Sequence, residues 1–129
     1  MVRLIVDLIR VIRCLLWTPN SPPAAFSKPV DWKLELTVLH KAKSLVEAEL
    51  NGFATSIAED EELLGLKLPL RTRFAVLYRI NVKEALSVHL QFLERLTALV
   101  LQLQEGVPFE ELRSNYGESP LAPYIAEIV

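Results

Sequence analysis

The sequence predicts an all-α protein, an irregular helical bundle of about six or seven helices that forms a single domain over residues 1–129. Apolar residues recur with helical spacing in several segments, and residues typical of helix ends separate those segments. No segment shows the sustained alternation of polar and apolar residues that marks a half-buried strand. The helices are therefore expected to bury their apolar sides against one another, with short connections between them.

The composition limits the classes of function. The chain has 51% apolar and 23% charged residues, and its formal net charge is -2. Because this charge provides no overall positive field, nucleic-acid binding is not expected. Cys14 is the only cysteine, which excludes an intramolecular disulfide and gives no reason to expect an oxidising compartment. We therefore expect an intracellular protein, in a compartment that the sequence does not specify.

The first segment, residues 2–17, is rich in aliphatic side chains and looks at first like a signal or an anchor. Arg3, Asp7, Arg10 and Arg13 interrupt it too often for a transmembrane span or for the apolar part of a signal peptide. On a helix the first three of these charges lie on one side, and leucine, isoleucine and valine cover the rest. A mostly buried helix is expected here, and no transmembrane segment is predicted.

A proline-rich loop should follow within the domain. Residues 18–30 hold four of the eight prolines, and proline removes a backbone donor and restrains the residue before it. Asp31 can then cap a helix over about residues 32–50. Asn51 and Gly52 offer that helix an end in the left-handed region.

Ser56 and Glu59 have the spacing of a capping box, in which the hydroxyl and the carboxylate each accept a hydrogen bond from a free backbone amide. A short acidic helix is expected over residues 57–64, and Gly65 should end it. Asp60 is near the positive end of the dipole of this helix. The acidic cluster therefore needs no functional explanation.

Pro69 opens another helical pattern, which continues to Asn81. Asn81 can end this helix or cap the following one, so a bend is expected there. The next helix should run over residues 82–104, along a leucine-rich stripe that Gly106 closes. Two later prolines each precede a short helix in the tail.

No enzyme signature is present in the sequence. The chain has no glycine-rich phosphate loop, no Cys/His pair at metal-ligand spacing and no nucleophile elbow, and it holds only four glycines. His40 and His89 lie within helical patterns and lack a second ligand three or four residues away, so they are expected to pack or to face solvent. We therefore expect no catalytic, cofactor-binding or metal-binding residue in this chain.

Four residues are candidates for contact with a partner. They are Arg71, Tyr78, Arg79 and Lys83, in or near the helix that Pro69 opens. If that helix continues, Arg79 and Lys83 are one turn apart and form a basic edge with Arg71. Such an edge can attract an acidic partner. The alternative is an ordinary solvated helix face.

A longer motif lies in residues 45–86. A helix ends at a glycine and an aromatic residue, a Thr-Ser pair leads into an acidic helix, and an arginine-rich helix follows. The residues that carry this motif are Gly52, Phe53, Thr55, Ser56, Glu59, Asp60, Leu63, Leu64, Arg71, Arg79, Lys83 and Leu86. In order and spacing they resemble the C-terminal substrate-binding domain of Rubisco large-subunit-type SET-domain lysine methyltransferases. Asn81 and Val82 depart from the pattern, because the family favours glycine and glutamate there.

The resemblance implies a function. In that family the SET domain binds S-adenosylmethionine and transfers the methyl group, while the helical domain helps to hold the protein substrate. The cofactor-contacting Asn-His step and the catalytic tyrosine motif of the SET domain are missing here. The resemblance therefore implies a non-catalytic substrate-binding module, either a fragment, a split gene product or a domain that has lost its enzyme. Its partner would be a protein substrate or a SET domain, and S-adenosylmethionine would bind that separate SET domain.

Two other hypotheses stay open. A free-standing helical scaffold or oligomerisation module could self-associate through its apolar first and fifth helices. A peripheral membrane protein could use the first helix, whose polar side carries Arg3 and Arg10. The leading hypothesis is a protein-substrate-binding module of a protein-lysine N-methyltransferase.

Overall fold

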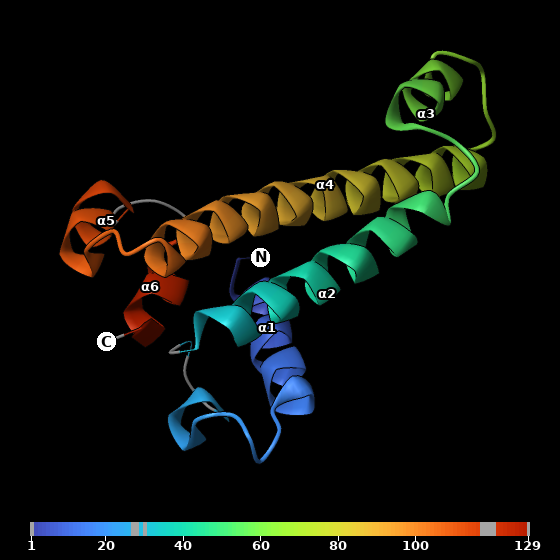
Figure 1. The fold of residues 1–129 in the computed structure, drawn as a ribbon. Coiled ribbons are helices and arrows are strands. Elements are labelled where there is room, and N and C mark those ends of the chain that lie inside the picture. Colours follow the sequence, from blue (N-terminus) through green and yellow to red (C-terminus); the bar gives the residue numbers. More distant parts are fainter. Residues whose placement is uncertain (1, 27–28, 30, 117–120, 129) are drawn as a thin grey trace.

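The computed structural model describes residues 2–26, 29, 31–116 and 121–128. These residues form helices and no strand, so the all-α prediction is confirmed (Figure 1). The described part of the chain also has the expected number of helices. In chain order they are α1 (Val2–Leu16), the 3-10 helix η1 (Pro23–Phe26), α2 (Trp32–Asn51), α3 (Ile57–Leu64), α4 (Leu70–Gln104), α5 (Phe109–Tyr116) and α6 (Ala122–Ile128).

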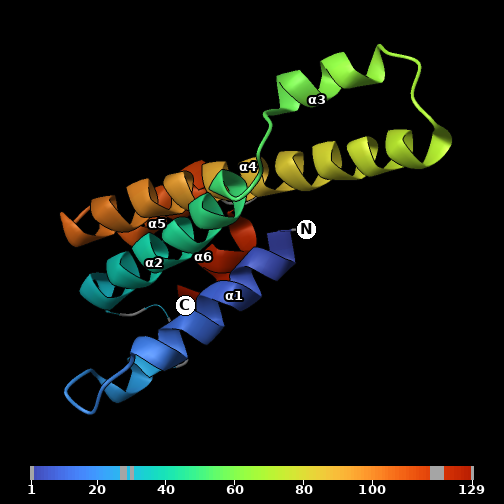
Figure 2. The same cartoon turned by 90° about the vertical axis from the view of Figure 1, so that its right-hand side faces the viewer.

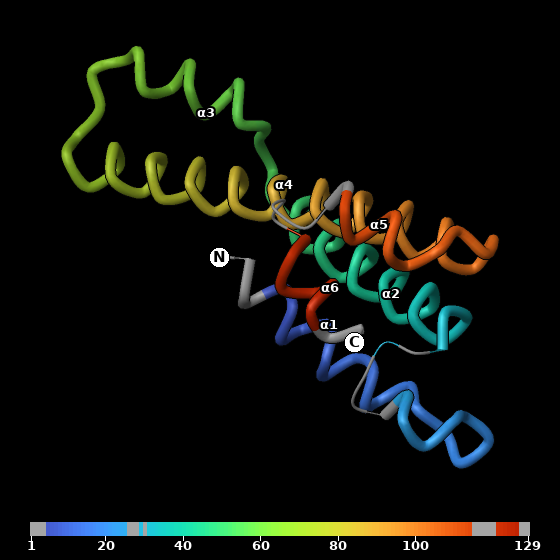
Figure 3. The backbone as a smooth tube through the Cα atoms, turned by 90° about the vertical axis from the view of Figure 1, so that its left-hand side faces the viewer, coloured from blue at the N-terminus to red at the C-terminus, as the bar shows by residue number. Residues whose placement is uncertain are grey.

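The two longest helices organise the molecule. α2 and α4 run side by side in opposite directions, and α1 packs across α2 (Figures 1 and 2). The first half of α4 extends beyond the end of α2, and α3 folds back onto it. We call α3 and residues 70–83 of α4 the projecting hairpin. It points away from the end of the bundle that carries α5 (Figure 3).

The main core lies where α1, α2 and the second half of α4 meet. Aliphatic side chains from these helices are buried there, and residues from α5 and α6 close one side. Its buried members are Ile5, Val6, Ile9, Ile12, Val38, Leu39, Ala42, Val46, Phe92, Leu93, Leu96, Leu99, Val100, Leu103, Leu112, Leu121, Tyr124 and Ile125. The projecting hairpin lies outside this core, so α3 needs its own attachment to α4.

The bend predicted at Asn81 is wrong. α4 is one continuous helix of 35 residues, and Asn81 is an exposed residue within it. Asparagine in a helix interior costs only about 0.7 kcal/mol relative to alanine. Ile80 and Lys83 are buried on either side of it, and Lys83 donates a hydrogen bond to Asp60 of α3. Packing at these neighbouring positions outweighs the weak local preference of Asn81 for a helix end.

The left-handed end predicted for α2 is also wrong. Gly52 has φ -71° and ψ -17°, in the right-handed region. Its backbone amide donates to the carbonyl oxygens of Ala48 at 3.1 Å and Glu49 at 3.3 Å, so a tightened last turn ends the helix. Gly106 behaves as expected, because its φ of 95° lies in the region that only glycine adopts readily.

The capping box is confirmed. The backbone amide of Glu59 donates to Ser56 Oγ at 3.1 Å, and the backbone amide of Ser56 donates to Glu59 Oε1 at 3.3 Å. α3 spans residues 57–64, as the sequence predicts. The cap sets where α3 begins, and it thereby places Asp60 on the turn that faces α4.

α1 is buried on one side only. Ile5, Val6 and Ile9 belong to the core, whereas Val11 and Leu15 are exposed. No helix among residues 2–26, 31–116 and 121–128 is long and apolar enough to cross a membrane. The proline-rich loop that follows is held in part by Trp17, whose Nε1 donates to the carbonyl oxygen of Pro22 at 3.1 Å. Residues 27, 28 and 30 of that loop lie outside the described residues.

Candidate partner-binding surface

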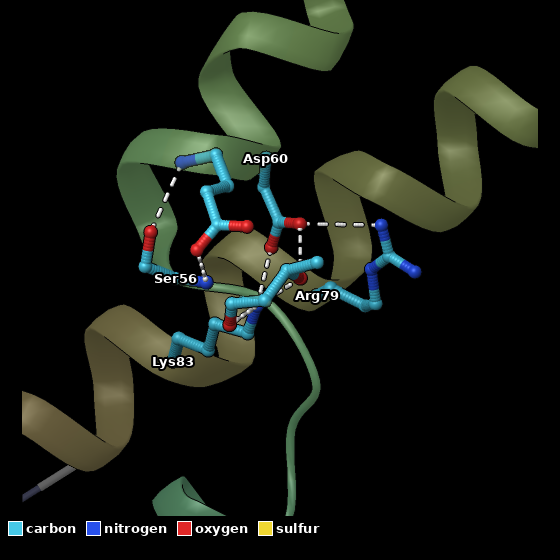
Figure 4. Close-up of polar contacts among 6 residues, drawn as sticks. Ser56, Asp60, Arg79 and Lys83 are labelled. Carbon is cyan, nitrogen blue, oxygen red and sulfur yellow. Dashed lines mark hydrogen bonds and ion pairs between the residues drawn. The ribbon is translucent and has the colours of Figure 1, made fainter.

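A buried ion cluster attaches α3 to α4. The carboxylate of Asp60 is fully buried between the two helices of the projecting hairpin. Lys83 Nζ donates to Asp60 Oδ2 at 2.5 Å, and Arg79 Nη2 donates to Oδ1 at 3.2 Å (Figure 4). The hydroxyl of Thr55 also donates to Oδ1, at 2.6 Å. The cluster thus gives a buried carboxylate two cationic partners and a hydroxyl donor, as a charge in this position requires.

Lys83 is committed to this cluster. Besides Asp60, its ammonium donates to the backbone carbonyl oxygen of Thr55 at 2.6 Å and to Thr55 Oγ1 at 3.0 Å. The ring centroid of Phe53 lies 5.1 Å from Nζ, within the range of a cation-π contact. A lysine ammonium has three donors, and these three acceptors use all of them. Lys83 has no donor left for another molecule.

The four candidate residues therefore do not form one exposed basic edge. Lys83 is one turn from Arg79, as expected for a continuous helix, but it is buried, with 3% of its surface exposed. Arg79 is half-buried and uses one side of its guanidinium on Asp60. Arg71 and Tyr78 are exposed. The predicted edge is thus reduced to Arg71 and the outer side of Arg79, with Tyr78 beside them on α4.

The ion cluster should make stability depend on pH. The hydrogen bonds from Lys83 and Thr55 outweigh the opposing effect of burial and hold the pKa of the Asp60 carboxyl below its usual range. A lowered pKa in the folded state means that Asp60 stabilises the protein fully above its unfolded pKa, near 3.8. This stabilisation is lost as the pH falls through the lower folded value.

The measurement compares wild type with Asp60→Asn in urea unfolding between pH 7 and pH 2. The variant should be less stable at pH 7, and the difference should shrink below about pH 4 as the wild-type carboxylate becomes protonated. Other carboxylates titrate equally in both proteins, so the difference isolates Asp60. A difference that stays constant over this range would contradict the assignment.

A row of apolar side chains follows α4 beside the candidate residues. Leu70, Phe74, Tyr78, Val82 and Leu86 are four residues apart, which places them on one ridge of the helix. We call them the apolar ridge. Its first three members are exposed by 67%, 60% and 70%, whereas Val82 and Leu86 are half-buried. Large apolar side chains exposed in a continuous row are typical of a contact surface.

An apolar groove lies between α1, α2 and α4. It has a volume of about 500 Å³ and is lined by Ile5, Asp7, Leu8, Val11, Leu45, Val46, Glu49, Leu86 and His89. Its aliphatic side chains include Val11 and Leu45, both exposed. Leu86 belongs both to this groove and to the apolar ridge.

The groove is mainly apolar. Its side chains are aliphatic apart from Asp7, Glu49 and His89. Among residues 2–26, 31–116 and 121–128, no group of three or more His, Cys, Asp or Glu side chains could hold a metal ion.

A second buried ion cluster joins α1, α2 and α6. Arg13 Nε donates to Glu35 Oε1 at 2.5 Å, and Arg13 Nη2 donates to Glu35 Oε2 at 3.1 Å. The hydroxyl of Tyr124 donates to the same Oε2 at 2.7 Å. Burial, aided by the negative charge of Glu35, raises the pKa of Tyr124 well above its usual value. Tyr124 therefore stays protonated as a donor, and the cluster fixes α6 to the bundle.

Comparison with known families identifies the family of the chain. A family model described as Rubisco LSMT substrate-binding matches residues 13–86. The chain belongs to this family. No curated relative and no solved structure matches the chain.

The part that matches the Rubisco LSMT substrate-binding model contains most of the features described above. It begins at Arg13 and ends at Leu86, so it includes the pairing of Arg13 with Glu35, the Asp60 cluster and the whole apolar ridge. The second half of α4 and helices α5 and α6 lie beyond it. The resemblance noted in residues 45–86 is confirmed and extends towards α1.

Sequence reasoning missed the buried role of three charged residues. The sequence places Asp60 near the positive end of a helix dipole, which does not indicate that it is buried. It gives no indication that Arg13 and Glu35 form an ion pair. A signal existed for Asp60, because it lies one turn from the Ser56 cap and faces a helix rich in cations. Arg13 and Glu35 each occupy a position on the apolar side of a helix. That pattern does not show that the two side chains are in contact.

Proposed function

We propose that the chain is a non-catalytic module that holds a protein substrate for a SET-domain protein-lysine N-methyltransferase. The family match carries this proposal. The apolar ridge and Arg71 supply the surface, because exposed aromatic side chains next to an arginine are typical of binding hot spots. S-adenosylmethionine would bind the SET domain, which would act inside the cell.

The position of the surface supports this role. Tyr78 and Phe74 lie on the projecting hairpin, away from the core, so a partner can contact them without disturbing the bundle. The Asp60 cluster fixes α3 against the other side of α4. A rigid surface loses less conformational freedom on binding than a mobile one, which favours affinity.

A photo-cross-linking amino acid in place of Tyr78 tests the proposal on the full chain in a cell extract. The expected adduct is a protein that a SET-domain methyltransferase modifies on lysine, and excess wild-type chain should reduce that methylation. The matched control carries the cross-linker at Leu101, an exposed apolar position on the other half of α4. The control should not give the same adduct.

Three outcomes would contradict the proposal. An adduct formed equally from both positions would show no specific surface. An adduct only with a second copy of the chain would favour the oligomerisation module. Binding of S-adenosylmethionine to the chain at micromolar concentration, measured by calorimetry, would overturn its non-catalytic role.

A further inference from the structure

The apolar groove between α1, α2 and α4 has an aliphatic lining with acidic residues beside it. The aliphatic part is formed by Ile5, Leu8, Val11, Leu45, Val46 and Leu86. Asp7 on α1 and Glu49 on α2 also line the groove, and Glu49 is exposed. Among the described residues of the lining there is no lysine or arginine. The fixed charges of the groove are therefore negative.

Both carboxylates of the groove can accept a cation. Glu49 has no ion-pair partner in the part of the chain that the structure describes. Asp7 Oδ1 accepts a hydrogen bond from Arg10 Nη1 at 3.0 Å, within α1. Such an exposed pair contributes little to stability, and a carboxylate has acceptor sites for more than one donor. A cation that approaches the groove is therefore attracted on both sides.

A buried nitrogen in the groove lacks a hydrogen-bond partner. Nε2 of His89 is inaccessible to solvent and has no partner among the described residues. His89 lines the groove together with Leu86. A buried polar atom without a partner is costly, and a polar group of a bound molecule would relieve that cost. This observation points to an occupant independently of the two carboxylates.

The size of the groove limits the length of the occupant. Its volume of about 500 Å³ lies within the usual range of ligand pockets, roughly 300–1,000 Å³. Ile5 and Val11 are six residues apart on α1, so the groove extends for about 9 Å along that helix. An extended chain covers this distance with about three residues. A short peptide segment therefore matches the groove better than a long helix.

The combination of an aliphatic lining with carboxylates favours basic side chains. Lysine and arginine place an apolar stem on aliphatic surface and keep the charged head in water or at a counter-charge. Leucine or isoleucine beside them can fill the buried part near Ile5 and Val46. An acidic segment would instead be repelled by Asp7 and Glu49.

We propose that the apolar groove binds a short segment of the partner protein that has an aliphatic side chain next to a lysine or arginine. The aliphatic side chain enters between α1 and α2, and the basic side chain is held by Glu49 and Asp7. A polar group of the segment contacts His89 Nε2. The inference rests on the proposed function for the identity of the partner, and it adds a basic segment of that substrate as a second contact, separate from Tyr78.

Two synthetic peptides test this proposal on the full chain. Both are short and contain the same two leucines, which are flanked by lysines in one peptide and by glutamates in the other. In fluorescence polarisation the lysine peptide should bind at least about fivefold more tightly than the glutamate peptide, and added salt should reduce this preference. Equal binding of the two peptides would overturn the basic occupant.

A matched pair of variants locates the basic side chain. Glu49→Lys should remove most of the preference for the lysine peptide, because it replaces an attraction by a repulsion. Glu47→Lys makes the same change in net charge and should keep the preference. Glu47 is also exposed, but it is two residues away on nearly the opposite side of α2. Loss of the preference in both variants would show attraction by overall charge and overturn the site.

A third variant locates the aliphatic side chain. Leu45→Gln should weaken both peptides about tenfold, because it removes an apolar contact that they share. Leu101→Gln is the control, since Leu101 is exposed to a similar degree but lies outside the groove. Circular dichroism should show every variant folded, because each changes an exposed side chain. Equal binding by both glutamine variants would place the peptide elsewhere.

The outcomes separate this inference from the proposed function. A specific Tyr78 adduct without any preference for the lysine peptide would overturn the groove inference and leave the proposed function intact. Groove binding of the lysine peptide without a specific Tyr78 adduct would support the site and overturn the partner that the proposed function names. A dimer that Leu45→Gln dissociates in analytical ultracentrifugation would replace the substrate segment with a second copy of the chain.

Discussion

Glu35→Ala is expected to lower the free energy of unfolding by about 3–5 kcal/mol, because removal of one partner leaves a buried charge without its counter-charge. Arg13 and Glu35 are almost fully buried, and their two hydrogen bonds join α1 to α2. Tyr124 adds α6 to the same carboxylate. Loss of Glu35 therefore removes the hydrogen bonds that join α2 to both α1 and α6, and it removes the carboxylate that faces the guanidinium of Arg13.

Urea unfolding monitored by circular dichroism provides the measurement. Tyr124→Phe keeps the ring and removes only the hydroxyl donor, so its expected loss is smaller, about 2 kcal/mol. Glu47→Ala is the control on α2, because Glu47 is exposed and its loss should change stability by less than about 0.5 kcal/mol. A Glu35→Ala variant as stable as Glu47→Ala would show that the buried cluster does not hold the bundle together.

The sequence was a good guide to the elements whose signals are local. The Ser56 cap, the start of α3 and the turn at Gly106 each depend on residues within a few positions, and all three are confirmed. The bend predicted at Asn81 is wrong because asparagine's weak preference for helix ends does not decide the local structure there. Lys83 binds Asp60 of α3 and Thr55 just before it, and no local pattern shows those contacts.

The candidate surface was predictable only in part. The sequence pattern placed Arg71, Tyr78 and Arg79 on α4, but it could not distinguish an exposed lysine from a buried one at position 83. That distinction depends on Asp60 and Thr55, which reach Lys83 only once α3 has folded back. An apolar groove between helices was expected, but the residues that line it were not predictable, because its walls come from three separate helices.

Ile9→Ala and Val11→Ala form a pair that tests the role of α1. Ile9 is fully buried in the core, so truncation to alanine should cost about 2–5 kcal/mol through lost burial and the cavity left behind. Val11 lies two residues away with 56% of its surface exposed, and its truncation should change stability by less than about 0.5 kcal/mol. Urea midpoints of the two variants and of wild type give the comparison.

The same two variants distinguish a structural role of α1 in the bundle from a role in membrane attachment. If α1 is integral to the bundle, Ile9→Ala lowers the urea midpoint and Val11→Ala does not. Equal stability of all three proteins, together with binding of wild type to anionic lipid vesicles that Val11→Ala reduces, would mean that α1 is a surface-attachment helix rather than part of the core. The burial of Ile5, Val6 and Ile9 in the core, where α1 packs against α2, argues for the first outcome, since those side chains cannot contact a bilayer while they hold the bundle together.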